Sequence, residues 1–201
     1  MLYLSEMKRL LTILILIFTL QTPSQADDIR DFQIEGMSVG DSLLDYFSEE
    51  EIQKKLKTAY SYKDKFKLFS IESSKYEIYE SVQFVVKRGD RKFEIYNIVG
   101  VFGYHNNIND CYKKKDTIGK ELSDMFKDAK QNDEATKHDA DKSGESKATT
   151  LWINLDSGAA VAVACYDWSE KMTNQNDWRD NLKVAILSAE FKKFLDNEAY
   201  K

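Results

Sequence analysis

Residues 76–104 read YEIYESVQFVVKRGDRKFEIYNIVGVFGY, and the rest of the chain can be organised around this stretch. From residue 76 to residue 86, large apolar side chains alternate with polar ones, which is the pattern of a strand with one buried face. The dipeptide Gly89-Asp90 fits a two-residue turn that requires a positive φ at its first position. Folding the chain there places Phe84 opposite Ile95 and brings both apolar sets to one face. The sequence therefore predicts a central antiparallel hairpin.

The first 26 residues have the pattern of an export signal. Lys8 and Arg9 form a positive n-region, residues 10–20 form an apolar segment too short to cross a bilayer comfortably, and Ser24-Gln25-Ala26 is a small-x-small cleavage site. We expect cleavage near Ala26 and a mature protein in the periplasm or outside the cell, with only transient membrane contact through the signal peptide. Residue 27 is Asp and not Cys, which argues against a lipid anchor. An uncleaved N-terminal membrane anchor is the alternative.

The charge balance argues against two classes of partner. The chain carries 29 basic and 34 acidic residues, a net charge of −5. Cleavage after residue 26 removes Lys8, Arg9 and Glu6 and makes the net charge −6. A nucleic-acid-binding protein needs a basic face, and so does a protein that binds anionic lipid by charge. We therefore expect no nucleic-acid partner and no charge-driven membrane binding.

The chain has two cysteines, Cys111 and Cys165. An even cysteine count in an exported protein indicates a disulfide, and both cysteines lie in patterned elements. We predict a Cys111–Cys165 bond; two buried free thiols are the alternative. A zinc site is not expected, because the chain has no Cys-x-x-Cys pair and only two histidines, His105 and His138. No phosphate loop or other cofactor motif is present, so we predict no metal and no cofactor.

The remaining pattern predicts one domain, residues 27–201, of the α+β class. Strands are expected at residues 66–71, 150–155, 159–168 and 182–186, and helices at 43–47, at 49–56 with Ser48 as cap, from Asn106 or Asn107 to about Phe126, and after Ser188. With the central hairpin, this gives an antiparallel sheet of about five to six strands with helices packed on one face. Residues 127–147 lack large apolar side chains and are predicted to form a polar flexible loop.

Residues 159–168 have an unusual distribution of small side chains. Val161, Val163 and Cys165 alternate on one side, and the alanines at 160, 162 and 164 lie on the other. Small residues allow a helix to approach a sheet closely. We therefore expect the helix that carries Cys111 to pack on the alanine face.

Aromatic residues of the central hairpin form a candidate ligand face. Tyr79, Tyr96, Phe102 and Tyr104 lie on the second side of the predicted strands, and Tyr79 is expected to lie opposite Gly100, where its ring could cover bare backbone. If no helix covers these rings, they form a platform for a sugar or a partner protein. If a helix covers them, they belong to the core.

Gly40-Asp41-Ser42-Leu43 spells the signature of the GDSL hydrolases, secreted esterases with a serine nucleophile. The resemblance would make Ser42 the nucleophile. The chain departs from the family pattern because neither histidine follows an aspartate by three residues, and because the predicted sheet is antiparallel. A serine without a base is a poor nucleophile. We predict that Ser42 is a helix cap.

Residues 32–48, FQIEGMSVGDSLLDYFS, and the run 182–186, LKVAI, followed by Glu190-Phe191, resemble an uncharacterised group of small exported proteins from marine α-proteobacteria. The likeness covers most of the mature chain and implies no activity. Gly36-Met37 and Phe47-Ser48 also resemble the opening of the BamE-like outer-membrane assembly modules. This layout implies a role in the envelope. The chain departs from these modules by its missing anchor cysteine, its long third helix and its extra hairpin.

These observations favour a periplasmic binding protein without catalytic residues. The leading interpretation is a partner-binding or envelope-assembly module, whose partner is an envelope protein. Two alternatives remain open: a small secreted hydrolase that uses Ser42, and a binder of glycans or small ligands that uses the candidate ligand face.

Overall fold

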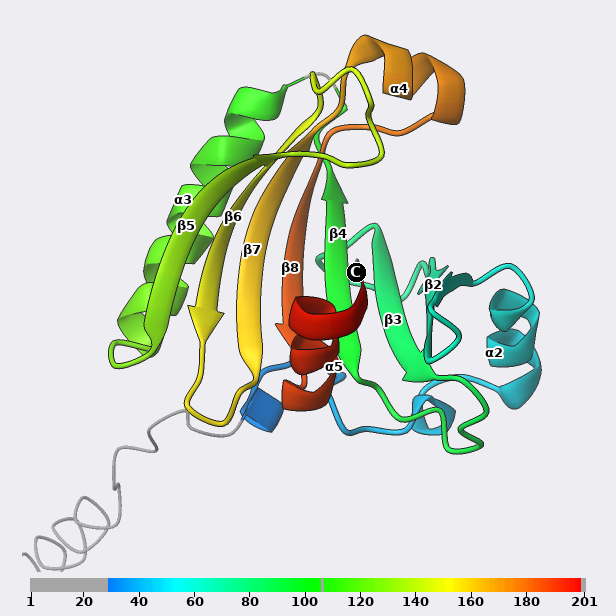
Figure 1. The fold of residues 1–201 in the computed structure, drawn as a ribbon. Helices are drawn as coiled ribbons and strands as arrows, with labels where there is room; N and C mark the ends of the chain where they lie inside the picture. The colour runs from blue at the N-terminus through cyan, green and yellow to red at the C-terminus, as the bar shows by residue number, and fades with distance from the viewer. Residues whose placement is uncertain (1–28, 106, 200–201) are drawn as a thin grey trace, which may run out of the picture.

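The computed structural model describes residues 29–105 and 107–199. They form one antiparallel sheet with the strand order β1-β2-β3-β4-β8-β7-β6-β5 (Figure 1). The strands are β1 (Tyr60–Tyr62), β2 (Phe66–Ile71), β3 (Ser81–Lys87), β4 (Asn97–Gly103), β5 (Lys130–Lys137), β6 (Lys147–Asn154), β7 (Ala160–Asp167) and β8 (Asn181–Leu187). The predicted signal peptide and its cleavage site lie outside the described residues. None of the helices described is long and apolar enough to cross a membrane.

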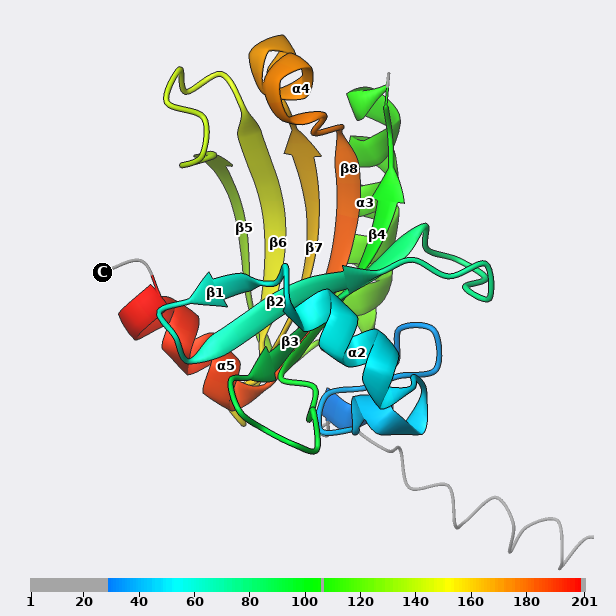
Figure 2. The ribbon, with the colours of Figure 1, turned by 90° about the vertical axis from the view of Figure 1, so that its right-hand side faces the viewer.

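The helices lie on both faces of this sheet. They are α2 (Glu49–Leu56), α3 (Ile108–Met125), α4 (Glu170–Asn176) and α5 (Ala189–Phe194), with the short turns η1 (Ile29–Asp31), η2 (Leu43–Asp45) and η3 (Leu195–Ala199). Helix α3 packs behind the strands β6 to β8, whereas α5 lies on the opposite face (Figures 1 and 2). Helix α2 shares the α3 side, where its Ile52 joins the cluster that holds Val82 and Phe84.

The predicted α+β class and the single antiparallel sheet are confirmed, but two details are wrong. The sheet has eight strands and not five to six, and α5 packs on the face opposite to α3. One additional strand, β5, lies inside the segment 127–147 that was predicted to be a loop. All eight residues of β5 are exposed, and the strand is held by its backbone pairing with β6. A strand without a buried face has no apolar alternation that a sequence could display.

The central hairpin forms with a longer connection than predicted. Gly89 has the expected positive φ, +80°. Strand β3 ends at Lys87, before this turn, and its Phe84 pairs with Ile98 instead of Ile95. The carboxylate of Asp90 accepts hydrogen bonds from the backbone N–H groups of residues 92 and 94, both at 2.9 Å. Residues 93–95 pair with residues 40–43 of the N-terminal segment, so they are not available to extend β4.

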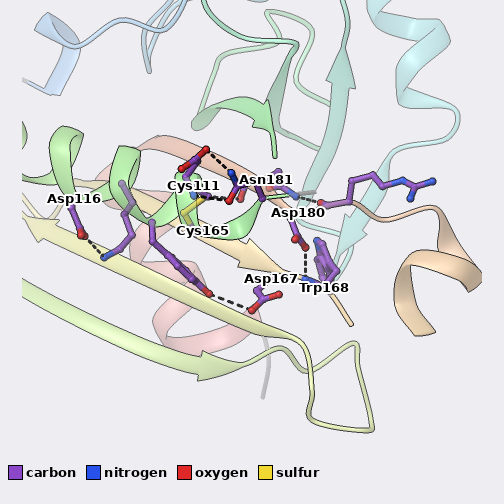
Figure 3. Close-up of a disulfide and its surroundings, with 12 residues drawn as sticks. Cys111, Asp116, Cys165, Asp167, Trp168, Asp180 and Asn181 are labelled. Carbon is purple, nitrogen blue, oxygen red and sulfur yellow. Dashed lines mark hydrogen bonds and ion pairs between the residues drawn. A yellow bond between two sulfur atoms is a disulfide. The ribbon is translucent and has the colours of Figure 1, made fainter. Parts of the chain in front are cut away.

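Cys111 and Cys165 join α3 to β7, as predicted (Figure 3). Both side chains are fully buried, and their Cα atoms are 6.0 Å apart. The expectation that α3 packs on the alanine face is wrong, because Cys165 points away from those alanines. The small residue that permits close packing is Gly119 of α3. A Cβ atom at Gly119 would lie 2.9 Å from Cδ2 of Leu151.

Candidate functional site

The alanine face of the sheet opens into a groove of about 360 Å³. Its lining comes from both ends of the sheet: Tyr62 and Leu68 belong to β1 and β2, and Thr150 and Trp152 belong to β6. Four strands separate β2 from β6 in the sheet order, which corresponds to roughly 24 Å across a flat sheet. One groove can have both sets as walls only because the sheet is curved (Figure 2). The volume lies in the range of small-ligand sites.

Small side chains form the floor of the groove. Ala162 of β7 lies between Trp152 of β6 and Ala185 of β8 in one cross-strand row, and Ala164 occupies the next row. Larger residues in these positions would fill the space. At one end the groove is closed by Phe191 of α5 and by Leu195, which follows it. Helix α5 begins where Phe191 N donates a hydrogen bond to the Oγ atom of its cap Ser188 (3.2 Å).

Lys183 is the cation of the groove floor. It lies beside Ala164 in the sheet, and its ammonium nitrogen is 4.5 Å from the centroid of the Tyr166 ring. Removal from water lowers the pKa of Lys183 to about 8. Among the described residues, no carboxylate lies within ion-pair distance of this ammonium, and its one close partner is the tyrosine ring. The groove therefore contains a partly desolvated positive charge without a counter-ion in the described part of the chain.

The second lysine of the groove is already neutralised. Lys192 of α5 contacts both carboxylate oxygens of Asp196 at 2.6 Å, and its nitrogen lies 5.5 Å from the centroid of the Trp152 ring. The indole Nε1–H of Trp152 donates to Glu134 at 2.9 Å. These contacts fix the Trp152 wall of the groove. They leave Lys183 as the groove cation that an anion can pair with.

A polar atom near the α5 end also has no partner. The Oδ1 atom of Asn97 is buried and accepts no hydrogen bond from the described residues. Asn97 lines the groove and pairs with Leu187 in the sheet. A buried acceptor without a donor costs free energy, so a donor from a bound ligand would stabilise this arrangement.

An aromatic cluster extends from the Lys183 end of the groove. The Trp168 ring lies 4.4 Å from His138 and 4.6 Å from Trp178, measured between ring centroids, and it stacks on Tyr166 at 6.0 Å. Burial, followed by the positive charge of Lys183, lowers the pKa of His138. His138 is therefore expected to be neutral at pH 7, which avoids a second positive charge beside the groove.

The loop that carries His138 is held by Asp141. The carboxylate of Asp141 accepts hydrogen bonds from Ser143, Ser146 and Ser169, the last of which also caps α4. The hydroxyls of Ser146 and Ser143 are the main donors, and they hold the pKa of Asp141 well below its usual value. The ionised carboxylate thus fixes the position of the 138–146 loop against α4.

We expect Asp141→Asn to lower the melting temperature at pH 7 and to have less effect in acid. A carboxyl group with a depressed pKa in the folded state stabilises the protein above its unfolded pKa of about 3.9 and loses this effect as the pH falls toward the folded pKa. Melting curves of both proteins between about pH 7 and about pH 2.5 should converge. Asp139→Asn changes an exposed neighbour and is the control. A difference that stays constant over this range would contradict the assignment.

The four residues of the predicted ligand face do not lie together. Tyr79 is half-buried between two core clusters, and its ring covers Gly100, whose added Cβ would be 2.5 Å from it. Phe102 and Tyr104 are neighbours on the α3 side, with ring centroids 5.4 Å apart. Phe102 is 40% exposed. Tyr96 is buried on the opposite face, against Phe66.

Ser42 acts as a helix cap in the structure. Its Oγ accepts a hydrogen bond from Leu44 N at 3.2 Å and donates one to the carbonyl oxygen of Lys92 at 2.6 Å. Neither partner is a base, so the contacts of Ser42 do not activate it as a nucleophile. Within residues 29–105 and 107–199, no three metal-binding side chains are grouped as a metal site would require.

No family model, curated protein or solved structure is detectably similar to this chain. The groove must therefore be interpreted from its own residues. No expectation drawn from the sequence included this groove, although the sequence contains two signals of it. The alanines at 160, 162 and 164 form one side of a strand, and Lys183 interrupts an otherwise apolar run, 182–187. A lysine between apolar residues on a face of small side chains indicates a cavity with one polar contact.

Proposed function

We propose that this protein is an exported, non-catalytic binding module that holds a small, largely apolar ligand in the groove. The observation that carries the proposal is the alanine floor, because Ala162, Ala164 and Ala185 keep space open between α5 and the aromatic cluster. Ligand sites are typically concave and mostly apolar, with a few polar groups that orient the ligand. Lys183 and Asn97 provide such groups. The ligand class is the small-ligand alternative named above, but the site lies on the face of the sheet opposite to Phe102 and Tyr104.

Export is the second part of the proposal. It is supported by the signal-like pattern of residues 1–26 and by a buried disulfide, which is typical of oxidising compartments. A partner protein in the envelope, as the resemblance implies, stays a prediction. It is compatible with a ligand in the groove, because the exposed strand β5 lies at the edge of the sheet and away from the groove floor.

The test is binding of a neutral apolar fluorescent probe, N-phenyl-1-naphthylamine. We expect its emission to rise on binding to the folded protein, and we expect Ala162→Phe and Ala185→Phe to abolish the rise because the added ring fills the groove. Ala135→Phe places the same ring on the exposed strand β5 and is the matched control. Melting curves show which variants are folded. Unchanged binding in both folded groove variants would place the probe elsewhere and refute the proposal.

A further inference from the structure

Three properties of the groove limit what it can hold. Its volume of about 360 Å³ corresponds to about a dozen non-hydrogen atoms at the roughly 30 Å³ that each water molecule occupies in the liquid. Its walls and floor are mostly apolar, with Leu68, Val99 and Leu187 among the lining residues. Polar side chains also line the groove, among them Gln83 and Asp196, and the two groups that we assign to the ligand lie apart. Lys183 pairs with Val101 in the sheet, and Asn97 is four residues from Val101 along β4, which is roughly 14 Å.

The charges around Lys183 make this position selective for an anion. The ammonium faces the Tyr166 ring from β7. The nearest side chains of its cross-strand row, Val101, Ala164 and Thr150, are neutral, and the row ends at Glu134 of β5. His138, a neutral imidazole at pH 7, supplies no counter-ion to Lys183. Asp196 forms an ion pair with Lys192 of α5. Glu134 of β5 accepts a hydrogen bond from the neutral Trp152 indole and keeps its charge, but it lies three strands from Lys183, roughly 14 Å across the sheet. A ligand carboxylate at Lys183 would therefore meet a partly desolvated cation that has no carboxylate partner among the described residues, and a charge-assisted hydrogen bond to it would be strong.

We propose that the groove binds an elongated small molecule with a single acidic group on an apolar body of about ten non-hydrogen atoms, and that Lys183 pairs with the acid. The apolar body lies over Ala162 and Ala185 toward α5. This inference rests on the proposed function, because it specifies the ligand class for the same groove. It adds that charge, and not only apolar contact, selects the ligand.

Decanoate, decan-1-ol and decylamine test the inference, because they share a ten-carbon body and differ in the head group. Calorimetric titration of the full mature protein at pH 7 should show decanoate binding at least about tenfold more tightly than decan-1-ol, the factor that a hydrogen bond to a charged group provides. Decylamine should bind more weakly than decan-1-ol. In Lys183→Met decanoate should bind no more tightly than decan-1-ol, because its carboxylate has lost the cation and is still partly removed from water. Lys183→Arg should keep the preference for decanoate.

The variants also report whether the fold is intact. Burial opposes the charged form of Lys183, so Lys183→Met should not lower the melting temperature. Lys130→Met removes an exposed lysine from β5 and should leave all three affinities unchanged. The preference for decanoate should decrease between about pH 7 and about pH 9.5, as Lys183 loses its proton.

The outcomes separate this inference from the proposed function. Equal affinity of the wild-type protein for decanoate and decan-1-ol overturns the role of Lys183 and leaves apolar binding in place. A preference for decanoate that survives Lys183→Met also overturns it. If N-phenyl-1-naphthylamine binds and neither decyl compound does, the ligand class is wrong and the groove proposal stands. If the naphthylamine probe does not bind either, the proposed function itself fails.

Discussion

Reduction of the Cys111–Cys165 disulfide is expected to lower the free energy of unfolding by about 4 kcal/mol. The bond joins residues 54 apart in sequence. In the chain-entropy model, closing a loop of this length lowers the entropy of the unfolded chain, which stabilises the folded protein by about 4 kcal/mol. For a domain of this size the melting temperature should fall by about 10 °C. The direct measurement is urea-induced unfolding with and without a reductant. The sulfur atoms are buried in the folded protein, so the reductant reaches them as the protein unfolds.

The control for this prediction is the double variant Cys111→Ala, Cys165→Ala, whose unfolding curve should not respond to the reductant. Peptide mapping under non-reducing conditions should recover the two cysteines in one linked fragment. Two alkylatable thiols in protein purified from an oxidising compartment, or identical curves of the wild type with and without reductant, would contradict the assignment. The bond matters for the groove because it fixes α3 to the back of β7, whose front carries the alanine floor.

Elements with local signals were predictable from the sequence. Asn107, Ser48 and Ser188 each cap the helix that was expected to follow them, and the bounds of α2 agree with the prediction. A cap needs only a side-chain oxygen within three residues of free backbone N–H groups, so the sequence alone contains the information. Strand β2 and the hairpin of β6 and β7 were recognised from alternation and from a glycine-containing turn, which are equally local.

The register of the central hairpin was not predictable in this way. The residue preferences of Gly89-Asp90 favour a two-residue turn. In the structure, however, residues 93–95 pair with residues 40–43, about fifty positions earlier in the chain. The Oγ atom of Ser42 and the carboxylate of Asp90 fix this arrangement through backbone contacts at Lys92. Tertiary pairing of this kind competes with the turn preference, and a single sequence does not show which of the two is stronger.

The groove was missed for a related reason. Alternation shows that the alanines share a face, but it does not show whether a helix or open space lies over them. Two packing contacts decide which face stays open. Gly119 lets α3 pack closely on the face that carries Leu151, and α5 covers only one end of the alanine face. Both are long-range packing relations. Alternation alone assigns the four candidate aromatics to one face, but Tyr96 precedes β4 and lies on the side of the sheet opposite to Phe102.

Gly100→Ala is expected to destabilise the protein by about 2 kcal/mol, the cost of overpacking a filled core site. A glycine in the interior of a strand normally reduces stability, so its replacement by alanine should otherwise be favourable by about 0.5–1 kcal/mol. Here an added Cβ would lie 2.5–2.6 Å from three atoms of the Tyr79 ring. That ring is held between the two core clusters on the α3 side and cannot withdraw freely.

A double-mutant cycle with Tyr79→Ala isolates this contact. Tyr79→Ala alone should be destabilising, because it removes a half-buried ring, but in that background Gly100→Ala should become neutral or stabilising. Gly103→Ala in the same strand is the matched control. Its Cβ would meet the far ends of the His105 and Glu80 side chains, which can move, so its cost should be small. Urea unfolding curves of the set provide the free energies. An equal cost of Gly100→Ala with and without the tyrosine ring would show that the ring is not what requires glycine at this position.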